Sequence, residues 1–204
     1  MYLISLTTIL SLFLGIGLAA SSGFKVFLPL FLTSFLAFLD FDLISITEDV
    51  VWLKNPIVLF VIGIFTILEI SIYFIPFVDN RMDKVKVPLS FITGALVMKA
   101  TFMLSSSSAG WIISFVFGGF LAMFFSYICA IVRRITTITT RGAGNFLVNI
   151  AELSVVLLLT SISILASPLA FLIIVFLIIL SYMALNRLEK RIPNDLKHTM
   201  LNVE

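Results

Sequence analysis

Two glutamates, Glu69 and Glu152, each interrupt a long run of apolar residues. A charged group at the centre of a membrane helix costs about 2.5–3.5 kcal/mol, so chains tolerate it mainly where it faces a cavity or a partner. One interpretation is a pair of carboxylates that bind a cation or carry a proton. The other is that each glutamate is neutral or hydrogen-bonded and only ties helices together.

Two lysines provide the natural opposite charges. Lys25 lies at the turn between the first two apolar runs, and Lys99 lies deeper, eleven residues after Pro88. Either lysine can pair with a glutamate or bind an anionic headgroup or phosphate. Each can also extend its ammonium group to the membrane surface, and it would then be an anchor without a chemical role.

Two asparagines extend the polar surface near Glu152. Asn145 and Asn149 are four residues apart, and Asn149 and Glu152 are three apart. On a helix these spacings place the three side chains on one face. Because the rest of this segment is apolar, we expect the polar face to point into a helical bundle.

Asp79 and Asp83 form a second acidic pair, also four residues apart. On a continuing helix they share a face, and two carboxylates at a membrane surface can coordinate a cation through their oxygens. They can equally be paired with neighbouring basic residues in a solvated loop, which the spacing alone favours. Those neighbours are Arg81, Lys84 and Lys86.

Nothing in the sequence has the pattern of a catalytic or cofactor site. The single histidine, His198, lies in a polar tail, and the single cysteine, Cys129, lies in an apolar run. Neither has the partners of a His/Cys metal site, and no glycine-rich turn has the Gly-Lys-Ser/Thr of a nucleotide loop. We predict that the protein is not an enzyme, with no catalytic residues, metal or cofactor. A net charge of +2 gives no reason to expect nucleic acid.

The composition indicates whether the protein is soluble in water or lies in a membrane. Of the 204 residues, 61% are hydrophobic and 12% are charged, and 21 are phenylalanine. A soluble domain is about 45–50% apolar and about 25% charged. The composition therefore excludes a soluble globule and predicts an all-α membrane protein.

A helix needs about 20 apolar residues to cross a hydrocarbon core of about 30 Å. We expect a transmembrane bundle over residues 1–186, followed by a polar cytoplasmic tail over 187–204. The first, second and fourth segments are short or carry Gly and Pro, so they can be tilted, broken or re-entrant. The bundle has seven candidate segments, at 3–20, 24–40, 57–78, 87–104, 110–132, 145–166 and 168–186.

Loop charges predict the orientation. The loops at 79–86 and 133–144 and the tail after 186 are rich in Lys and Arg, whereas those at 41–56 and 105–109 are not. Basic loops remain in the cytoplasm, so this alternation places the C-terminus inside and, through seven segments, the N-terminus outside.

Residues 1–79 and 86–166 are candidates for two inverted three-helix repeats, followed by a final helix. In each half a glycine-containing short helix carries a lysine, and the third helix carries a glutamate. Many secondary transporters have this architecture, with the site at the repeat interface. The alternative is two unrelated halves, because the lysine-to-glutamate spacing differs and little else aligns.

Several of these motifs, in this order, resemble an uncharacterised bacterial integral-membrane family, the domain of unknown function 4126. The family pattern has an Asp-Lys pair where this chain has Tyr73 and Phe74. The resemblance implies that Glu69, Asp79, Asp83, Asn145 and Glu152 act together in a bacterial inner-membrane protein, and it brings no known activity. It is carried by Gly17-Leu-Ala-Ala-Ser-Ser-Gly23-Phe-Lys-Val-Phe-Leu-Pro29, Leu68-Glu69, Ile75-Pro76-Phe-Val-Asp79, Gly94-Ala95 and Thr140-Arg-Gly-Ala-Gly144-Asn145.

The predicted function is a small transporter or permease for an ion, an anionic small molecule or a lipid. Glu69 and Glu152 would be its coupling or ion-binding groups, and Lys25 and Lys99 their counter-charges or anion contacts. Membrane lipids are the expected partners, with a homo-oligomer or other membrane proteins as further candidates. The alternative is a structural or assembly subunit of a larger membrane complex.

Overall fold

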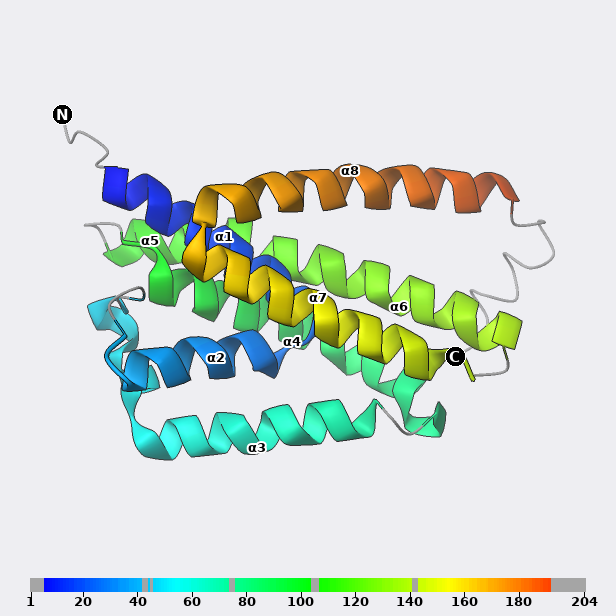
Figure 1. The fold of residues 1–204 in the computed structure, drawn as a ribbon, viewed down its shortest axis with the longest axis horizontal. Helices are drawn as coiled ribbons and strands as arrows, with labels where there is room; N and C mark the ends of the chain where they lie inside the picture. The colour runs from blue at the N-terminus through cyan, green and yellow to red at the C-terminus, as the bar shows by residue number, and fades with distance from the viewer. Residues whose placement is uncertain are drawn as a thin grey trace. The chain divides into compact units, whose positions relative to one another are not determined.

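A computed structural model describes residues 6–41, 44, 46–73, 76–103, 107–140 and 143–191. This described part is helical and holds no strand (Figure 1). The elements in chain order are α1 (Leu6–Phe24), α2 (Phe27–Phe38), a 3₁₀ helix (Glu48–Lys54), α3 (Pro56–Ile72), α4 (Pro76–Thr101), α5 (Ser107–Ile113), a π-helical turn (Ser114–Gly119), α6 (Phe120–Thr140), α7 (Asn145–Leu165) and α8 (Ser167–Arg191).

The all-helical membrane class is confirmed, although the count of seven spans is not. Among the described residues, four helices are long and apolar enough to cross a membrane. A fifth is added if the 3₁₀ helix and α3, which meet at 71°, form one broken span. The four are Leu6–Phe24, Ser108–Thr140, Asn145–Leu165 and Ser167–Ala184.

The chain forms two compact units, residues 1–171 and 172–204. The second unit holds the remainder of α8, so the predicted tail begins as helix and continues as helix to Arg191. Residues 192–204, including His198, lie outside the described residues. The candidate site belongs entirely to the first unit.

The first two helices form a hairpin whose second arm is short. At 1.5 Å per residue, the 12 residues of α2 extend about 18 Å, which is less than the hydrocarbon core of about 30 Å. The chain breaks at Lys25 and Val26, between α1 and α2, and α2 then runs beside α3 (Figure 1). The expectation that the second segment is short is thus confirmed.

Helix α4 corrects the predicted loop at 79–86. The helix starts at Pro76 and continues through this charged segment, whereas α3 ends at Ile72. Proline fits the first turn of a helix, because the N–H groups there need no intrahelical acceptor. Pro76 therefore begins the next helix.

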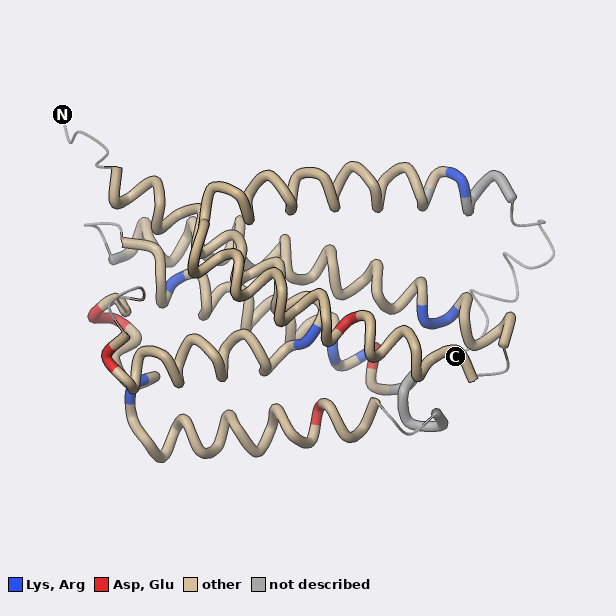
Figure 2. Tube along the Cα trace, in the orientation of Figure 1, with Lys and Arg blue, Asp and Glu red and all other residues tan. Residues whose placement is uncertain are grey.

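The core of the first unit forms where α1 contacts α4, α6 and α7. Small residues allow this close approach: a Cβ placed on Gly17 would lie 2.1 Å from the Ser163 hydroxyl oxygen, and one on Gly23 would lie 2.5 Å from the Ala122 carbonyl oxygen. Such packing replaces the hydrophobic effect, which does not drive helices together in lipid. Figure 2 shows that the charged positions are grouped, with long uncharged stretches of helix between the groups.

Candidate functional site

Glu152 lies at the centre of a buried charged cluster. Helix α7 places it on one face with Asn145, Asn149 and Val156, at the three- and four-residue spacing of a helix, and all four are buried. The carboxylate is only 5% exposed. The polar stripe predicted from the sequence therefore points into the bundle.

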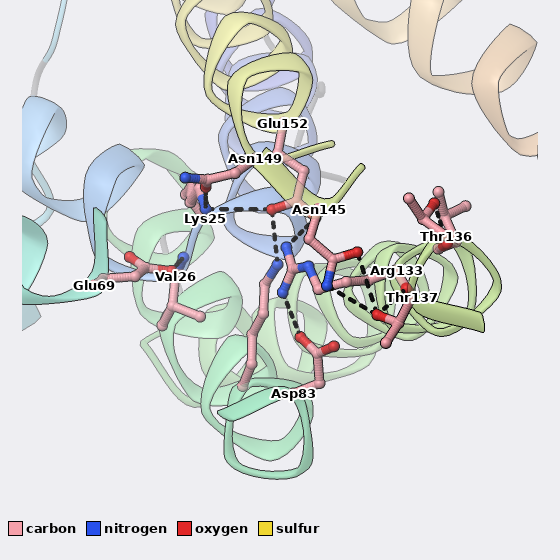
Figure 3. A network of polar contacts seen from close by, with 12 residues as sticks. Lys25, Val26, Glu69, Asp83, Arg133, Thr136, Thr137, Asn145, Asn149 and Glu152 are labelled. Atoms are coloured by element: carbon pink, nitrogen blue, oxygen red, sulfur yellow. Dashed lines mark hydrogen bonds and ion pairs between the residues drawn. The ribbon is translucent and has the colours of Figure 1, made fainter. Parts of the chain in front are cut away.

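Three cations from three other parts of the chain converge on this carboxylate, and Figure 3 labels two of them, Lys25 and Arg133. Arg133 Nη2 on α6 lies 2.5 Å from Oε1. Lys25 Nζ, at the tip of the α1–α2 hairpin, lies 3.2 Å from Oε2, and Lys86 Nζ on α4 lies 3.4 Å from the same oxygen. All three cationic side chains are buried. One carboxylate is thus shared by three positive charges.

Asp83 and Asn149 complete the inner contacts. Arg133 Nη1 lies 2.6 Å from Asp83 Oδ1, and Lys25 Nζ donates to Asn149 Oδ1 at 2.6 Å. The second oxygen of Asp83 is buried and has no hydrogen-bond partner among the described residues. The cluster therefore retains an unused acceptor beside its arginine.

The ring of Tyr73 faces the same three cations. Its centroid lies 4.2 Å from Lys25 Nζ, 4.2 Å from Arg133 Cζ and 5.3 Å from Lys86 Nζ. An aromatic face attracts cations, and the attraction grows when water is excluded. Tyr73, which is 4% exposed, therefore stabilises three cations that the carboxylates of Glu152 and Asp83 do not fully balance.

Glu69 sits on the other side of the hairpin tip and caps α2. Its two oxygens accept hydrogen bonds from the backbone N–H groups of Val26 at 2.7 Å and Phe27 at 2.9 Å. The first N–H groups of a helix lack intrahelical acceptors, and the positive end of the helix dipole favours an anion. Glu69 on α3 thereby fixes the backbone at the start of α2, directly after Lys25.

Glu69→Ala is expected to destabilise the fold by about 1–2 kcal/mol, the upper range for loss of a helix cap. Glu69→Gln keeps one acceptor oxygen and should cost less. The measurement is the midpoint of thermal unfolding of the purified protein in detergent. Ser71→Ala, at an exposed position on the same helix, is the control, and an equal loss in both alanine variants would contradict the capping role.

The structure brings most of the predicted residues together. Lys25, Asp83, Asn149 and Glu152 join directly through ionic contacts and hydrogen bonds. Asn145 joins at the edge, because its amide donates to the Thr137 hydroxyl at 2.8 Å. The side chain of Asp79 lies outside the described residues.

Lys99 belongs to a different place. It is 1% exposed, and its Nζ lies 2.5 Å from Asp49 Oδ2 on the 3₁₀ helix and 5.9 Å from the centroid of the Trp111 ring. The predicted role as counter-charge to Glu69 or Glu152 is therefore corrected: the partner is an aspartate that follows the first hairpin.

The sequence did not predict a role in the site for Arg133, Lys86 or Tyr73. Arg133 and Lys86 lie one residue beyond the predicted segments 110–132 and 87–104, and Tyr73 lies inside the segment 57–78, where it departs from the family pattern. A signal for Arg133 was present. Ser126, Cys129 and Ala130 precede it at helical spacing on a buried face, so the periodicity of α6 continues through the arginine.

A cavity of about 270 Å³ opens beside the cluster, between α3, α4 and the start of α2. Glu69, Tyr73 and Lys86 form its polar part. Within the described residues, no group of three or more His, Cys, Asp and Glu side chains is placed to hold a metal ion. The site combines buried cations and carboxylates with an adjoining apolar space.

Comparison with known proteins places this arrangement in a family. The family model for a domain of unknown function (DUF4126) matches residues 12–187. No curated protein and no solved structure matches the chain. Since the match covers most of the sequence, including every cluster residue, the chain belongs to the family of the domain of unknown function 4126.

Proposed function

We propose that this protein is a small transporter for an anionic substrate in a bacterial inner membrane, with its C-terminus in the cytoplasm. The observation that carries the proposal is the convergence of Lys25, Lys86 and Arg133 on the single carboxylate of Glu152 at a break between two helices. The alternating loop charges support the orientation.

The charge balance favours an anion. The cluster and the hairpin tip hold three cations and three carboxylates, namely Asp83, Glu152 and Glu69. The positive end of α2 adds about half a unit charge next to Glu69. An arriving anion therefore meets a slight excess of positive charge in a medium where charges interact strongly.

When no substrate is bound, the carboxylate of Glu152 would bind the three cations in its place. Burial of unpaired cations is costly, so the empty site needs an internal anion. A substrate anion would compete with Glu152 for the same ammonium and guanidinium groups, and its departure would return them to the carboxylate. Binding and release then proceed without leaving three buried cations exposed to lipid.

The origin of the cluster residues supports movement as well as binding. Lys25 comes from the first predicted half, and Lys86, Arg133 and Glu152 come from the second. Transporters with inverted repeats place broken helices at such an interface, and rocking of one half against the other opens the site to alternate sides. The repeat itself stays a prediction.

Transport is tested in proteoliposomes with two anionic probes, radiolabelled inorganic phosphate and a lysophosphatidate carrying a fluorophore on its chain. We expect flux of at least one probe above that of protein-free liposomes. Lys25→Gln should slow it about tenfold or more, because loss of a charge-assisted hydrogen bond is worth about 1.5–3 kcal/mol. Lys54→Gln, which changes the partner of an exposed ion pair, is the matched control.

Absence of flux for both probes, or equal flux in the wild type and Lys25→Gln, would overturn the proposal. The alternative of a structural or assembly subunit would then take its place. It predicts that other membrane proteins copurify in fixed ratio with the full chain.

A further inference from the structure

The cavity beside the cluster is apolar over most of its lining. Its apolar walls include Phe27 from α2, Phe65 and Leu68 from α3, and Met82, Val85 and Leu89 from α4. Its volume of about 270 Å³ lies just below the range of ligand pockets, which begins at about 300 Å³. The space suits one slender apolar chain better than a bulky molecule.

The walls of the cavity reach the outer surface of the first unit, where large apolar side chains are exposed. Phe65 is 47% exposed, Leu68 is 49% exposed and Val85 is 53% exposed. In a membrane protein, exposed apolar side chains in the middle of helices contact acyl chains. The cavity therefore opens between α3 and α4 beside exposed apolar side chains, a surface that acyl chains would cover in a membrane.

One buried cation, Lys86, lines the inner end of the cavity. It carries three N–H donors, yet its one hydrogen bond to a side chain in the described part is the 3.4 Å contact with Glu152. Glu69 also lines the cavity, but its oxygens are held by the backbone N–H groups at the start of α2. Of the two charged side chains that line the cavity, Lys86 therefore has the weaker hydrogen bonding within the described residues.

We propose that this cavity binds a single-chain lipid with an anionic headgroup, which enters laterally from the membrane. The acyl chain would lie among the apolar walls between α3 and α4, and the headgroup would meet Lys86 and, behind it, Lys25 and Arg133. As a statement about the transported substrate, this inference rests on the proposed function. The binding site itself is measured without any flux.

The test uses photo-cross-linking of the full-length protein in nanodiscs. The probe is a lysophosphatidate with a diazirine in its chain, and labelled peptides are identified by mass spectrometry. We expect labels on residues 65–72 of α3 and 82–89 of α4. Unlabelled lysophosphatidate should compete about tenfold better than lysophosphatidylcholine, which has the same chain without net charge. Inorganic phosphate, which lacks the chain, should not compete.

Two matched variants separate the cavity from ordinary lipid contact. Leu68→Trp fills the cavity mouth and should abolish the labels, whereas Leu158→Trp, at another exposed leucine on α7, should leave them unchanged. Leu68→Trp alters no charge, so the result does not depend on whether the cluster tolerates substitution. Gel filtration confirms that both variants remain folded.

Labels spread evenly over lipid-facing helices, equal competition by lysophosphatidylcholine, or retained labelling in Leu68→Trp would overturn the inference. Competition by inorganic phosphate alone would also overturn it, since the site would then take a free anion. Site-specific labelling without flux would remove the proposed transport function and leave the lipid site in place. Flux without labelling on α3 and α4 would do the reverse.

Discussion

Glu152→Gln is expected to destabilise the protein by at least about 3–5 kcal/mol, the cost of removing one partner from a buried ion pair. The reason is that Lys25, Lys86 and Arg133 share this carboxylate. Neutralising it removes the ion pair that each of the two lysines forms with Glu152 in the described part of the chain, and it removes one of the two carboxylates bound by Arg133. The measurement is the thermal unfolding midpoint in detergent, followed by gel filtration after heating.

Asp40→Asn is the control for Glu152→Gln. It removes the carboxylate from an ion pair with Lys54 at 2.8 Å, but those side chains are 82% and 39% exposed. Exposed pairs contribute about 0–1 kcal/mol, so the midpoint should hardly change. Similar shifts in the two variants would show that the buried cluster contributes no more than a surface pair.

A second substitution separates charge from shape. In Glu152→Gln with Lys25→Met, one of the stranded cations is also removed, and the double variant should be more stable than Glu152→Gln alone. Residues in one ionic network show coupling energies of about 0.5–3 kcal/mol. Strictly additive losses of stability would mean that the charges act independently. That result would contradict the proposal that Glu152 binds the cations when no substrate is bound.

The sequence predicted the helices well where composition alone decides. The mostly apolar run at 145–166 forms α7 with boundaries within one residue, and α8 begins one residue before the predicted 168. These segments need no partner to be recognised, because about 20 apolar residues are enough to identify a span.

The start of helix α4 is harder to predict from the sequence, because its first half is charged. Asp83 and Lys86 look like loop residues in isolation, and only the folded bundle shows that each has a buried partner of opposite charge. Hydropathy counts the cost of each charge separately and cannot include an attraction between groups 50 or 66 residues apart. For the same reason, hydropathy does not predict that Arg133 is buried in the bundle.

The cost of burying a charge correctly predicts that Glu69 and Glu152 have buried partners, although the two partners differ in kind. Both stand out because a lone carboxylate in an apolar helix is expensive. Glu152 does hold cations, whereas Glu69 holds backbone N–H groups at a helix start, a partner that no sequence pattern predicts. Lys99 was detected by the same logic and paired with the wrong carboxylate, since spacing does not show which loop folds back over α4.

Gly94→Leu is expected to destabilise the protein by about 3 kcal/mol or more, the upper range for overpacking. Helix α4 crosses the π-helical turn at this glycine. A Cβ on Gly94 would lie 2.4 Å from Ala122 Cβ and 2.7 Å from the Gly118 carbonyl oxygen, and the latter belongs to backbone that cannot rotate away. The measurement is again the thermal unfolding midpoint.

Gly63→Leu is the matched control, because the nearest atom to its added Cβ is the Phe31 ring at 3.2 Å, a side chain that can shift. Leucine also favours helix over glycine by roughly 1 kcal/mol, so this variant should unfold no earlier than the wild type.

The crossing at Gly94 matters for the site because α4 carries Asp83 and Lys86 while α6 carries Arg133. Forcing the two helices apart would stretch the 2.6 Å contact between Arg133 and Asp83. Gly94→Leu should therefore reduce flux of the anionic probes even below its unfolding temperature, whereas Gly63→Leu should not. Normal flux with normal stability in Gly94→Leu would show that α4 does not approach α6 and the π-helical turn closely at Gly94. The positions of Asp83 and Lys86 relative to Arg133 would then not depend on this crossing.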